Sequence, residues 1–162
     1  MRWYDPTQIW KTAAVIAGIG AIAGLIKKML EKSADIESAI GWPYRLTGGA
    51  PSTPWSDGPK GVDCSGFAQM ALVLMEVMPA SATDRTAQGL ADNSYFIEDS
   101  ELKRGDLTFY GDSWDEVSHV GVYDGAGNII EASSGSGEIV IVPIETYHSS
   151  WRHDYLGAHR WE

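Results

Sequence analysis

The sequence contains little cysteine and few basic residues. Its 162 residues include one cysteine, Cys64, which excludes an intramolecular disulfide and a metal site built from several thiolates. Lysine and arginine number 12 against 22 aspartates and glutamates, for a net charge of −10. Binding to nucleic acid needs clustered basic side chains, so this balance argues against a nucleic-acid partner.

The composition also lacks the excess of charge and the shortage of apolar residues that are typical of disordered chains. Hydrophobic residues make up 44% of the chain and charged residues 21%, which indicates a globular protein. The length suits a single domain with an ordinary core and argues against a multidomain machine.

The longest uncharged run, residues 12–26, is short for a membrane span. A helix over these 15 residues is about 22 Å long, against about 30 Å for the hydrocarbon core of a bilayer. Gly20 and Gly24 belong to small-residue faces that let two helices approach closely. The run predicts a hydrophobic helix that contacts a protein assembly or a membrane surface, with a polar continuation to about residue 40.

Charge divides the chain at the same place. Residues 1–40 hold five basic and four acidic side chains, whereas residues 41–162 hold seven basic and 18 acidic ones. The first ten residues include Asp5 and Pro6 and do not match the basic start of a cleaved signal peptide. We therefore expect two parts, an anchoring or docking segment at 1–40 and a separate domain at 41–162.

Cys64 lies where a loop gives way to a predicted helix. Residues 47–61 are dense in Gly, Pro and Ser. Apolar residues then recur at the three- and four-residue steps of a helix with one buried face: Phe67, Met70, Ala71, Leu74 and Met78. A thiol at the helix start meets the positive end of the dipole and free N–H groups, which favour the thiolate and can bind an oxyanion. Single cysteines are often small buried packing residues, but this position favours a nucleophile.

A thiol nucleophile needs a base, and His119 is the best candidate. It lies in VSHVGVY (117–123), whose alternation predicts a strand with His119, Val117 and Gly121 on one face, and with open space beside Gly121. The other histidines, which are expected to be surface or packing residues, lie in the C-terminal part of the chain: His148, His153 and His159.

Glu131 follows in the next predicted strand, across the turn DGAGN (124–128). A hairpin there places its carboxylate opposite His119, where it can hold the imidazole as the acid of a catalytic triad does. The alternative is a solvated strand residue. No cofactor and no metal are predicted, because DGAGN lacks the spacing of a calcium-binding EF-hand and SSGSG (133–137) lacks the lysine of a phosphate-binding loop.

Together these segments resemble the NlpC/P60 cysteine peptidases of bacterial cell-wall turnover. The matching pieces span about residues 41–161 in the family's order: PYRLTGG, DCSGF, DRTAQ, LKRGDLTFY, SHVGVYDGAGNIIEAS and GAHR. The resemblance implies a papain-like α+β fold, in which the nucleophile helix packs on an antiparallel sheet. It also implies hydrolysis of peptidoglycan stem peptides, commonly at the γ-D-glutamyl–diaminopimelate bond or a neighbouring amide.

The resemblance also implies roles for individual residues. Cys64 matches the nucleophile and His119 the base, while Glu131 stands where the family usually has a histidine. Tyr44 matches a tyrosine that lines the site, Asp63 matches a polar residue of the substrate groove, and Ser65 beside the thiol is a further candidate for substrate binding. These substrate-binding assignments complete the predicted site.

Four interpretations of the whole protein stay open. The first is a peptidoglycan hydrolase of the cell envelope or its exterior. In the second, preferred version, a phage virion or a secreted machine delivers that enzyme through residues 1–40, which are too short and too helical for an SH3-like or LysM-like wall-binding module. The third is an inert module that kept the fold; acyl transfer to another nucleophile is also compatible with the same triad.

Overall fold

The computed structural model describes residues 36–46, 61–81, 85–151 and 154–161. The predicted N-terminal hydrophobic helix lies outside these residues, as does most of the loop at 47–61. The compact unit that contains the sheet begins at Ile36. Residues 36–40, which were predicted to end the N-terminal helix, instead include a 3-10 turn, η1 (Glu37–Ala39), whose Ala39 packs with Ile36 in the domain core.

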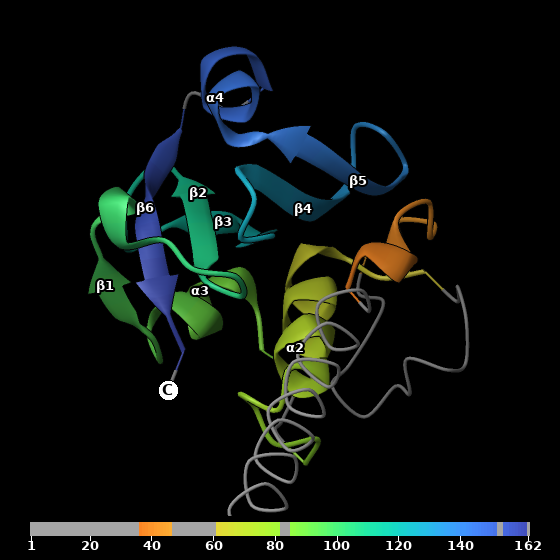
Figure 1. The fold of residues 1–162 in the computed structure, drawn as a ribbon, viewed down its shortest axis with the longest axis horizontal. Coiled ribbons are helices and arrows are strands. Elements are labelled where there is room, and N and C mark those ends of the chain that lie inside the picture. The colour runs from red at the N-terminus through yellow and green to blue at the C-terminus, as the bar shows by residue number, and fades with distance from the viewer. Residues whose placement is uncertain (1–35, 47–60, 82–84, 152–153, 162) are drawn as a thin grey trace, which may run out of the picture. The chain divides into compact units, whose positions relative to one another are not determined.

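The domain is built on one six-stranded antiparallel sheet with the order β1-β6-β2-β3-β4-β5 (Figure 1). The strands are β1 (Tyr95–Ile97), β2 (Leu107–Gly111), β3 (Val117–Tyr123), β4 (Asn128–Ser133), β5 (Glu138–Pro143) and β6 (Tyr155–Arg160). Strands β2 to β5 run as consecutive antiparallel neighbours, which confirms the predicted meander. The C-terminal strand β6 inserts between β1 and β2 and completes the sheet.

Helix α2 (Cys64–Leu74) begins at a side-chain cap. Asp63 precedes it, and its carboxylate Oδ1 accepts the backbone N–H of Gly66 at 2.8 Å. The helix ends earlier than predicted, because the chain turns at Glu76, which adopts a φ of 60°. Met78 therefore reaches the core from beyond the helix.

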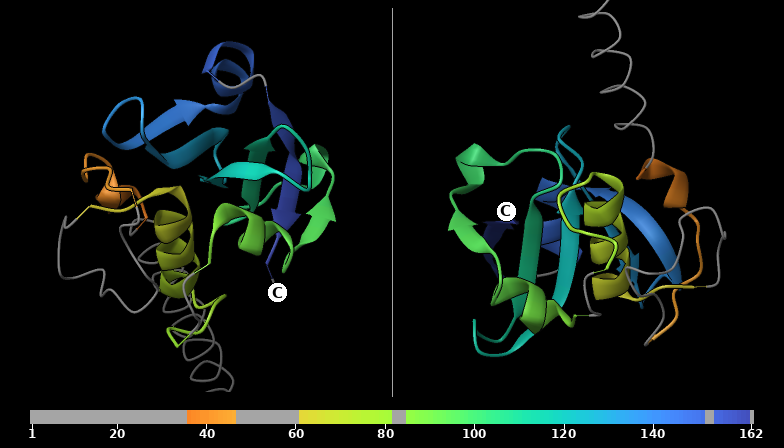
Figure 2. Two further views of the ribbon diagram at one scale, coloured as in Figure 1. Left: turned by 180° about the vertical axis from the view of Figure 1, so that it is seen from behind. Right: turned by 90° about the horizontal axis from the view of Figure 1, so that it is seen from below.

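The two faces of the sheet are covered by different elements. Helices α2 and α3 (Ala87–Ala91) lie on one face, as Figure 2 shows, and bury the main core with Phe67, Leu72, Leu90, Phe109, Val120 and Ile130. The 3-10 turn η3 (Asp99–Glu101) follows β1. A smaller core forms where α4 (Ile144–Thr146) and the π-helical turn η4 (Tyr147–Trp151) pack against Tyr110, Ile129 and Val142. This second core borders the predicted site.

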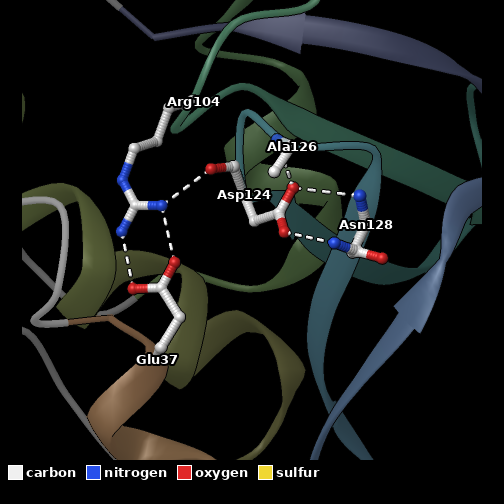
Figure 3. A network of polar contacts seen from close by, with 5 residues as sticks. All are labelled: Glu37, Arg104, Asp124, Ala126 and Asn128. Carbon is white, nitrogen blue, oxygen red and sulfur yellow. Dashed lines mark hydrogen bonds and ion pairs between the residues drawn. The ribbon is translucent and has the colours of Figure 1, made fainter.

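A polar cluster ties η1 to the turn between β3 and β4 (Figure 3). The guanidinium of Arg104 donates two hydrogen bonds to the Glu37 carboxylate, at 2.6 and 2.7 Å, and one to the carbonyl of Asp124 at 2.7 Å. The Asp124 carboxylate accepts the N–H groups of Ala126 and Asn128 and the Asn128 amide. The segment DGAGN is thus a hairpin turn closed by its own first side chain.

Candidate active site

Cys64 is the first residue of α2 and is half-buried. The capping carboxylate of Asp63 occupies the N–H of Gly66, and the Asp63 carbonyl accepts the N–H of Phe67 at 2.9 Å. The N–H groups of Cys64 and Ser65, the first two of the helix, have no intrahelical acceptor. The thiol therefore lies at the positive end of the helix dipole, beside backbone donors that can bind a negative oxygen.

His119 lies in β3, opposite Tyr110 of β2. A β-bulge follows, because Gly111 pairs with Val117 and leaves Ser118 without a partner in this ladder. The bulge shifts the alternation by one residue, so Val117 packs in the main core. The prediction that Val117 shares a face with His119 is therefore wrong.

Glu131 reaches His119 from the neighbouring strand. In the described strands, the β3–β4 ladder contains only the pairs Val122 with Ile130 and Tyr123 with Ile129. Continuing that register places Glu131 opposite Gly121, and so diagonal to His119 on the same face. The carboxylate Oε2 of Glu131 forms an ion pair with His119 Nε2. The predicted contact is present, although it is diagonal and not directly across the hairpin.

The sequence pattern predicts open space beside Gly121, but in the structure this space is filled. A Cβ atom at this position would lie 2.4 Å from Cγ2 of Ile129 and 3.1 Å from Oγ1 of Thr108. Ile129 belongs to the smaller core. The absence of a side chain at Gly121 therefore allows Ile129 to pack directly against β3. Any larger residue at this position would overpack the core.

His119 is held from both sides. Its Nε2 contacts Glu131, which leaves Nδ1 as the ring nitrogen that can face Cys64, whose thiol interacts with the ring. Burial of the ring opposes its charge, but the hydrogen bonds to Cys64 and Glu131, together with their negative charges, raise the pKa of His119 from 6.5 to about 9. The site thus favours the imidazolium form of His119 between Cys64 and the Glu131 carboxylate.

Tyr147 is a member of the site that sequence reasoning missed. It is fully buried in η4, and its hydroxyl donates to Glu131 Oε2 at 2.5 Å while lying 3.2 Å from His119 Nε2. No motif or spacing marks it among the seven tyrosines of the chain. Only the return of the chain over the sheet after β5 brings it to Glu131.

Tyr44 lies near the thiol, where the sequence placed it. Residues 41–44 run along the free edge of β5, and the N–H of Tyr44 donates to the Gly137 carbonyl at 2.8 Å. Tyr44 also forms an isolated bridge with Val62, just before α2. Burial, followed by the negative charges of Cys64 and Asp63, raises the pKa of Tyr44.

Asp63 and Ser65 flank the thiol in sequence and are joined to each other. The Ser65 hydroxyl donates to Asp63 Oδ1 at 3.0 Å, the same oxygen that caps the helix. Asp63 is half-buried and Ser65 is largely buried. The Asp63 carboxylate therefore has a structural role in starting α2, and substrate binding by these two residues stays a prediction.

Two other histidines are packing residues, as expected. The His148 ring stacks on Tyr155 at 4.0 Å, and burial lowers the pKa of His148. The His159 ring stacks on Trp114 at 4.6 Å, and burial lowers the pKa of His159 as well. His153 lies outside the described residues. Within those residues, no three His, Cys, Asp or Glu side chains converge as metal ligands do.

Comparison with known proteins identifies the family of the chain. The model of the NlpC/P60 family matches residues 41–160. The chain belongs to this family. The matched NlpC/P60 region contains the helix start with Cys64 and both strands that carry His119 and Glu131.

Several curated proteins of this kind are similar to the chain. The murein DD-endopeptidase MepH of Escherichia coli is 32% identical over 150 residues, which cover 89% of this chain and 52% of MepH. The peptidoglycan endopeptidase RipB of Mycobacterium tuberculosis is 34% identical over 113 residues, 66% of this chain and 44% of RipB. The γ-DL-glutamyl hydrolase of Bacillus subtilis is 29% identical over 79% of this chain and 28% of its own length. The chain thus spans about half or less of the relatives it matches.

Solved structures confirm the predicted NlpC/P60 fold. The peptidoglycan hydrolase RipB of M. tuberculosis is 25% identical with a TM-score of 0.58, covering 83% of this chain and 65% of the RipB chain. RipD of M. tuberculosis, described as a non-catalytic NlpC/P60 domain protein, is 21% identical with a TM-score of 0.57, covering 78% of this chain and 90% of RipD. At such identities the likeness concerns the fold.

Proposed function

We propose that this protein is a cysteine peptidase that hydrolyses amide bonds in peptidoglycan stem peptides, with Cys64, His119 and Glu131 as its triad. The observation that carries the proposal is the buried ion pair of His119 with Glu131, together with the stabilisation of the same imidazolium by Cys64 at a helix start. A nucleophile, a base and a group that orients the base are the parts that covalent amide hydrolysis needs. The named relatives support peptidoglycan as the substrate.

In the acylation step, the Cys64 thiolate attacks the carbonyl carbon of the amide, and the carbonyl π electrons move to oxygen. The N–H groups of Cys64 and Ser65 are the donors for that oxyanion. The oxyanion then collapses, the C–N bond breaks, and His119 gives its Nδ1 proton to the leaving amine. The products of this half-reaction are a thioester on Cys64 and a neutral imidazole.

In the deacylation step, the neutral imidazole of His119 takes a proton from water as the water oxygen attacks the thioester. The C–S bond breaks, the carboxylic product leaves, and the Cys64 thiolate and the imidazolium are restored. Glu131 keeps its charge throughout and stabilises the imidazolium at the start and the end of the cycle. No external redox partner or cofactor takes part in either step.

The substrate peptide is proposed to lie along Tyr44, Asp63 and Ser65. Tyr44 offers an aromatic surface next to the thiol, and Asp63 offers a negative charge that suits a cationic or amine-bearing stem peptide. The γ-D-glutamyl–diaminopimelate bond is our first candidate for cleavage. A DD-peptide bond, as in the name of the murein DD-endopeptidase MepH, is the second.

The test is digestion of purified peptidoglycan, with the products identified by mass spectrometry. Cys64→Ala and His119→Gln are expected to lose at least about a thousandfold in rate, because both remove a partner in the covalent step. His159→Gln is the matched control, since it replaces a half-buried histidine that stacks on Trp114. Undiminished cleavage by Cys64→Ala would refute the assignment, and the masses of the fragments identify the bond.

An inert binding module is the alternative, and it makes a different prediction. Without the thiolate–imidazolium pair, Cys64 reacts with iodoacetamide as an ordinary cysteine, with a rate that rises only in alkaline solution. With the pair, the rate is already high near neutral pH. Slow alkylation at neutral pH together with no fragments from peptidoglycan would favour the inert module.

We further propose that residues 1–40 attach the enzyme to a phage virion or a secreted assembly that delivers it to the cell envelope. The near-neutral, hydrophobic character of this segment contrasts with the 18 acidic residues of the rest of the chain. Among the described residues, no helix has the length and apolar character to cross a bilayer. Because the compact unit begins at Ile36, deleting residues 1–35 should leave soluble activity intact and abolish co-purification with the assembly. Retained co-purification would refute delivery through this segment.

A further inference from the structure

The Tyr147 hydroxyl lies in the corner formed by Glu131 and His119. It donates to Glu131 Oε2 at 2.5 Å, and its oxygen is 3.2 Å from His119 Nε2. The same carboxylate oxygen receives the ion pair with Nε2. One carboxylate oxygen is therefore shared between the imidazolium and the tyrosine hydroxyl.

The ring of Tyr147 holds this hydroxyl in one place. The side chain is fully buried in the smaller core, and its ring meets that of Tyr110 edge-on, with centroids 5.1 Å apart. A phenylalanine would serve the same packing, because only the hydroxyl reaches the charged pair. The hydroxyl is thus separable from the fold in an experiment.

We propose that Tyr147 is a positioning residue of the catalytic site, whose hydroxyl acts through Glu131 by sharing the negative charge of the carboxylate that contacts His119 Nε2. This inference rests on the proposed function. By sharing the charge, the hydroxyl keeps the imidazolium acidic enough to protonate the leaving amine.

The groups around His119 make the sign of the effect definite. Cys64 faces it from α2, Glu131 from β4, and Tyr110 from β2, with ring centroids 5.8 Å apart. The hydroxyl of Tyr110 bonds instead to His148 at 3.1 Å, and burial lowers the pKa of His148, which favours its neutral form. Among the described residues, the charges that act on His119 are thus those of Cys64 and Glu131.

An O–H group aimed at Glu131 stabilises the His119–Glu131 pair more after the pair has lost its proton, because the pair is then more negative. Removing the hydroxyl should therefore make His119 hold its proton more tightly. The acid in the amide-cleaving step becomes weaker, while the thiolate is preserved. This combination distinguishes a positioning role from simple loss of packing.

The test compares Tyr147→Phe with Tyr155→Phe. Tyr155 is the matched control, because it borders the same core and donates to a carboxylate, Asp99, at 2.6 Å. Cleavage of a soluble disaccharide-tetrapeptide muropeptide is measured against pH. In Tyr147→Phe the alkaline limb of kcat/KM is expected to move up by at least about half a pH unit, with kcat about tenfold lower and KM within about twofold. Tyr155→Phe should match the wild type.

A Glu131→Gln background gives a second measurement. There the hydroxyl has no carboxylate charge to share, so adding Tyr147→Phe should lower kcat by less than about twofold further. A tenfold loss in both backgrounds would mean that the hydroxyl acts independently of Glu131. An unmoved or lowered alkaline limb in Tyr147→Phe would equally overturn the proposal.

Alkylation of Cys64 by iodoacetamide separates this inference from the proposed function. It needs no substrate, and its rate against pH shows an alkaline inflection when His119 loses its proton. If the wild type cleaves no muropeptide, the proposed function fails, yet the upward shift of this inflection in Tyr147→Phe still supports the positioning role. An inflection that stays at its wild-type pH in that variant refutes the role, whether or not the enzyme cleaves peptidoglycan.

Discussion

Replacing Glu131 with glutamine measures how much of the charge on His119 depends on one buried carboxylate. The rise of the His119 pKa from 6.5 to about 9 corresponds to about 3 kcal/mol in favour of the imidazolium. Burial opposes this rise, while Cys64 and Glu131 both support it. Glutamine keeps the shape and an oxygen acceptor but removes the charge. We expect the pKa of His119 to fall by about one to two pH units in Glu131→Gln.

The assay is an NMR titration of the imidazole nitrogens, in which the His119 signals are assigned by their loss in His119→Gln. Glu138→Gln is the control, because it removes one negative charge from an exposed position on β5. Its effect on the His119 midpoint should be less than about 0.3 pH unit, since exposed charges are screened. A wild-type midpoint near 6.5, or identical midpoints in the wild type and Glu131→Gln, would refute the reasoning.

The same shift makes the stability of the protein depend on pH. The pKa of His119 is higher in the folded state than its ordinary value of 6.5, so the imidazolium stabilises the fold fully below that pH. This contribution is lost as the pH rises through about 9. Urea unfolding of the wild type should therefore show a larger fall in stability over this interval than Glu131→Gln does.

Three substitutions test the packing that supports the site, each by urea unfolding. Gly121→Ala should lose about 1–3 kcal/mol, because its new methyl group meets Ile129, and an unchanged stability would contradict that clash. Thr108→Val should gain about 1 kcal/mol, because the buried Thr108 hydroxyl has no hydrogen-bond partner among the described residues; a loss would argue for a missed partner. Glu37→Gln should lose no more than about 1 kcal/mol, and less in high salt, because the ion pair with Arg104 is partly exposed.

The parts of the site that depend on neighbouring residues were predictable from the sequence. The Gly- and Pro-rich stretch followed by apolar steps fixes where α2 begins, because helix caps are local signals. The end of α2 is less accessible: Met78 continues the helical spacing, yet the chain turns at Glu76 and delivers that side chain from a loop. A hydrophobic pattern predicts which side chains are buried, but it does not predict the backbone conformation that buries them.

Strand alternation placed His119 correctly on the face of Gly121 but placed Val117 wrongly on that face, because a bulge lies between Val117 and His119. The bulge between them depends on a close approach of β2, where a Cβ at Gly111 would lie 2.3 Å from the Glu116 carbonyl oxygen. That contact is between residues on either side of a loop, so the alternation of polar and apolar residues within β3 does not predict it. Likewise, the Glu131 contact was expected because a hairpin is local, but its diagonal geometry follows from the register.

Tyr147 was beyond reach because its role depends on long-range packing. It lies after β5, and only the turn of α4 and η4 over the sheet brings its hydroxyl back to Glu131. A fully buried tyrosine is most simply explained as a core residue, and its ring does serve the core. The hydrogen bond is visible only when both strands and the turn are in place.

The short ladder between β3 and β4 divides the sheet into two ribbons, β1-β6-β2-β3 and β4-β5, with two residue pairs at the seam. The ion pair of His119 with Glu131 crosses this seam, so it joins the two ribbons in addition to its proposed catalytic role. In most sheets, backbone hydrogen bonds hold neighbouring strands together, and side-chain contacts are not needed for this. A loss of alignment between the two ribbons would therefore also separate His119 from Glu131, so the proposed activity should be lost when the seam opens, even while each ribbon stays folded.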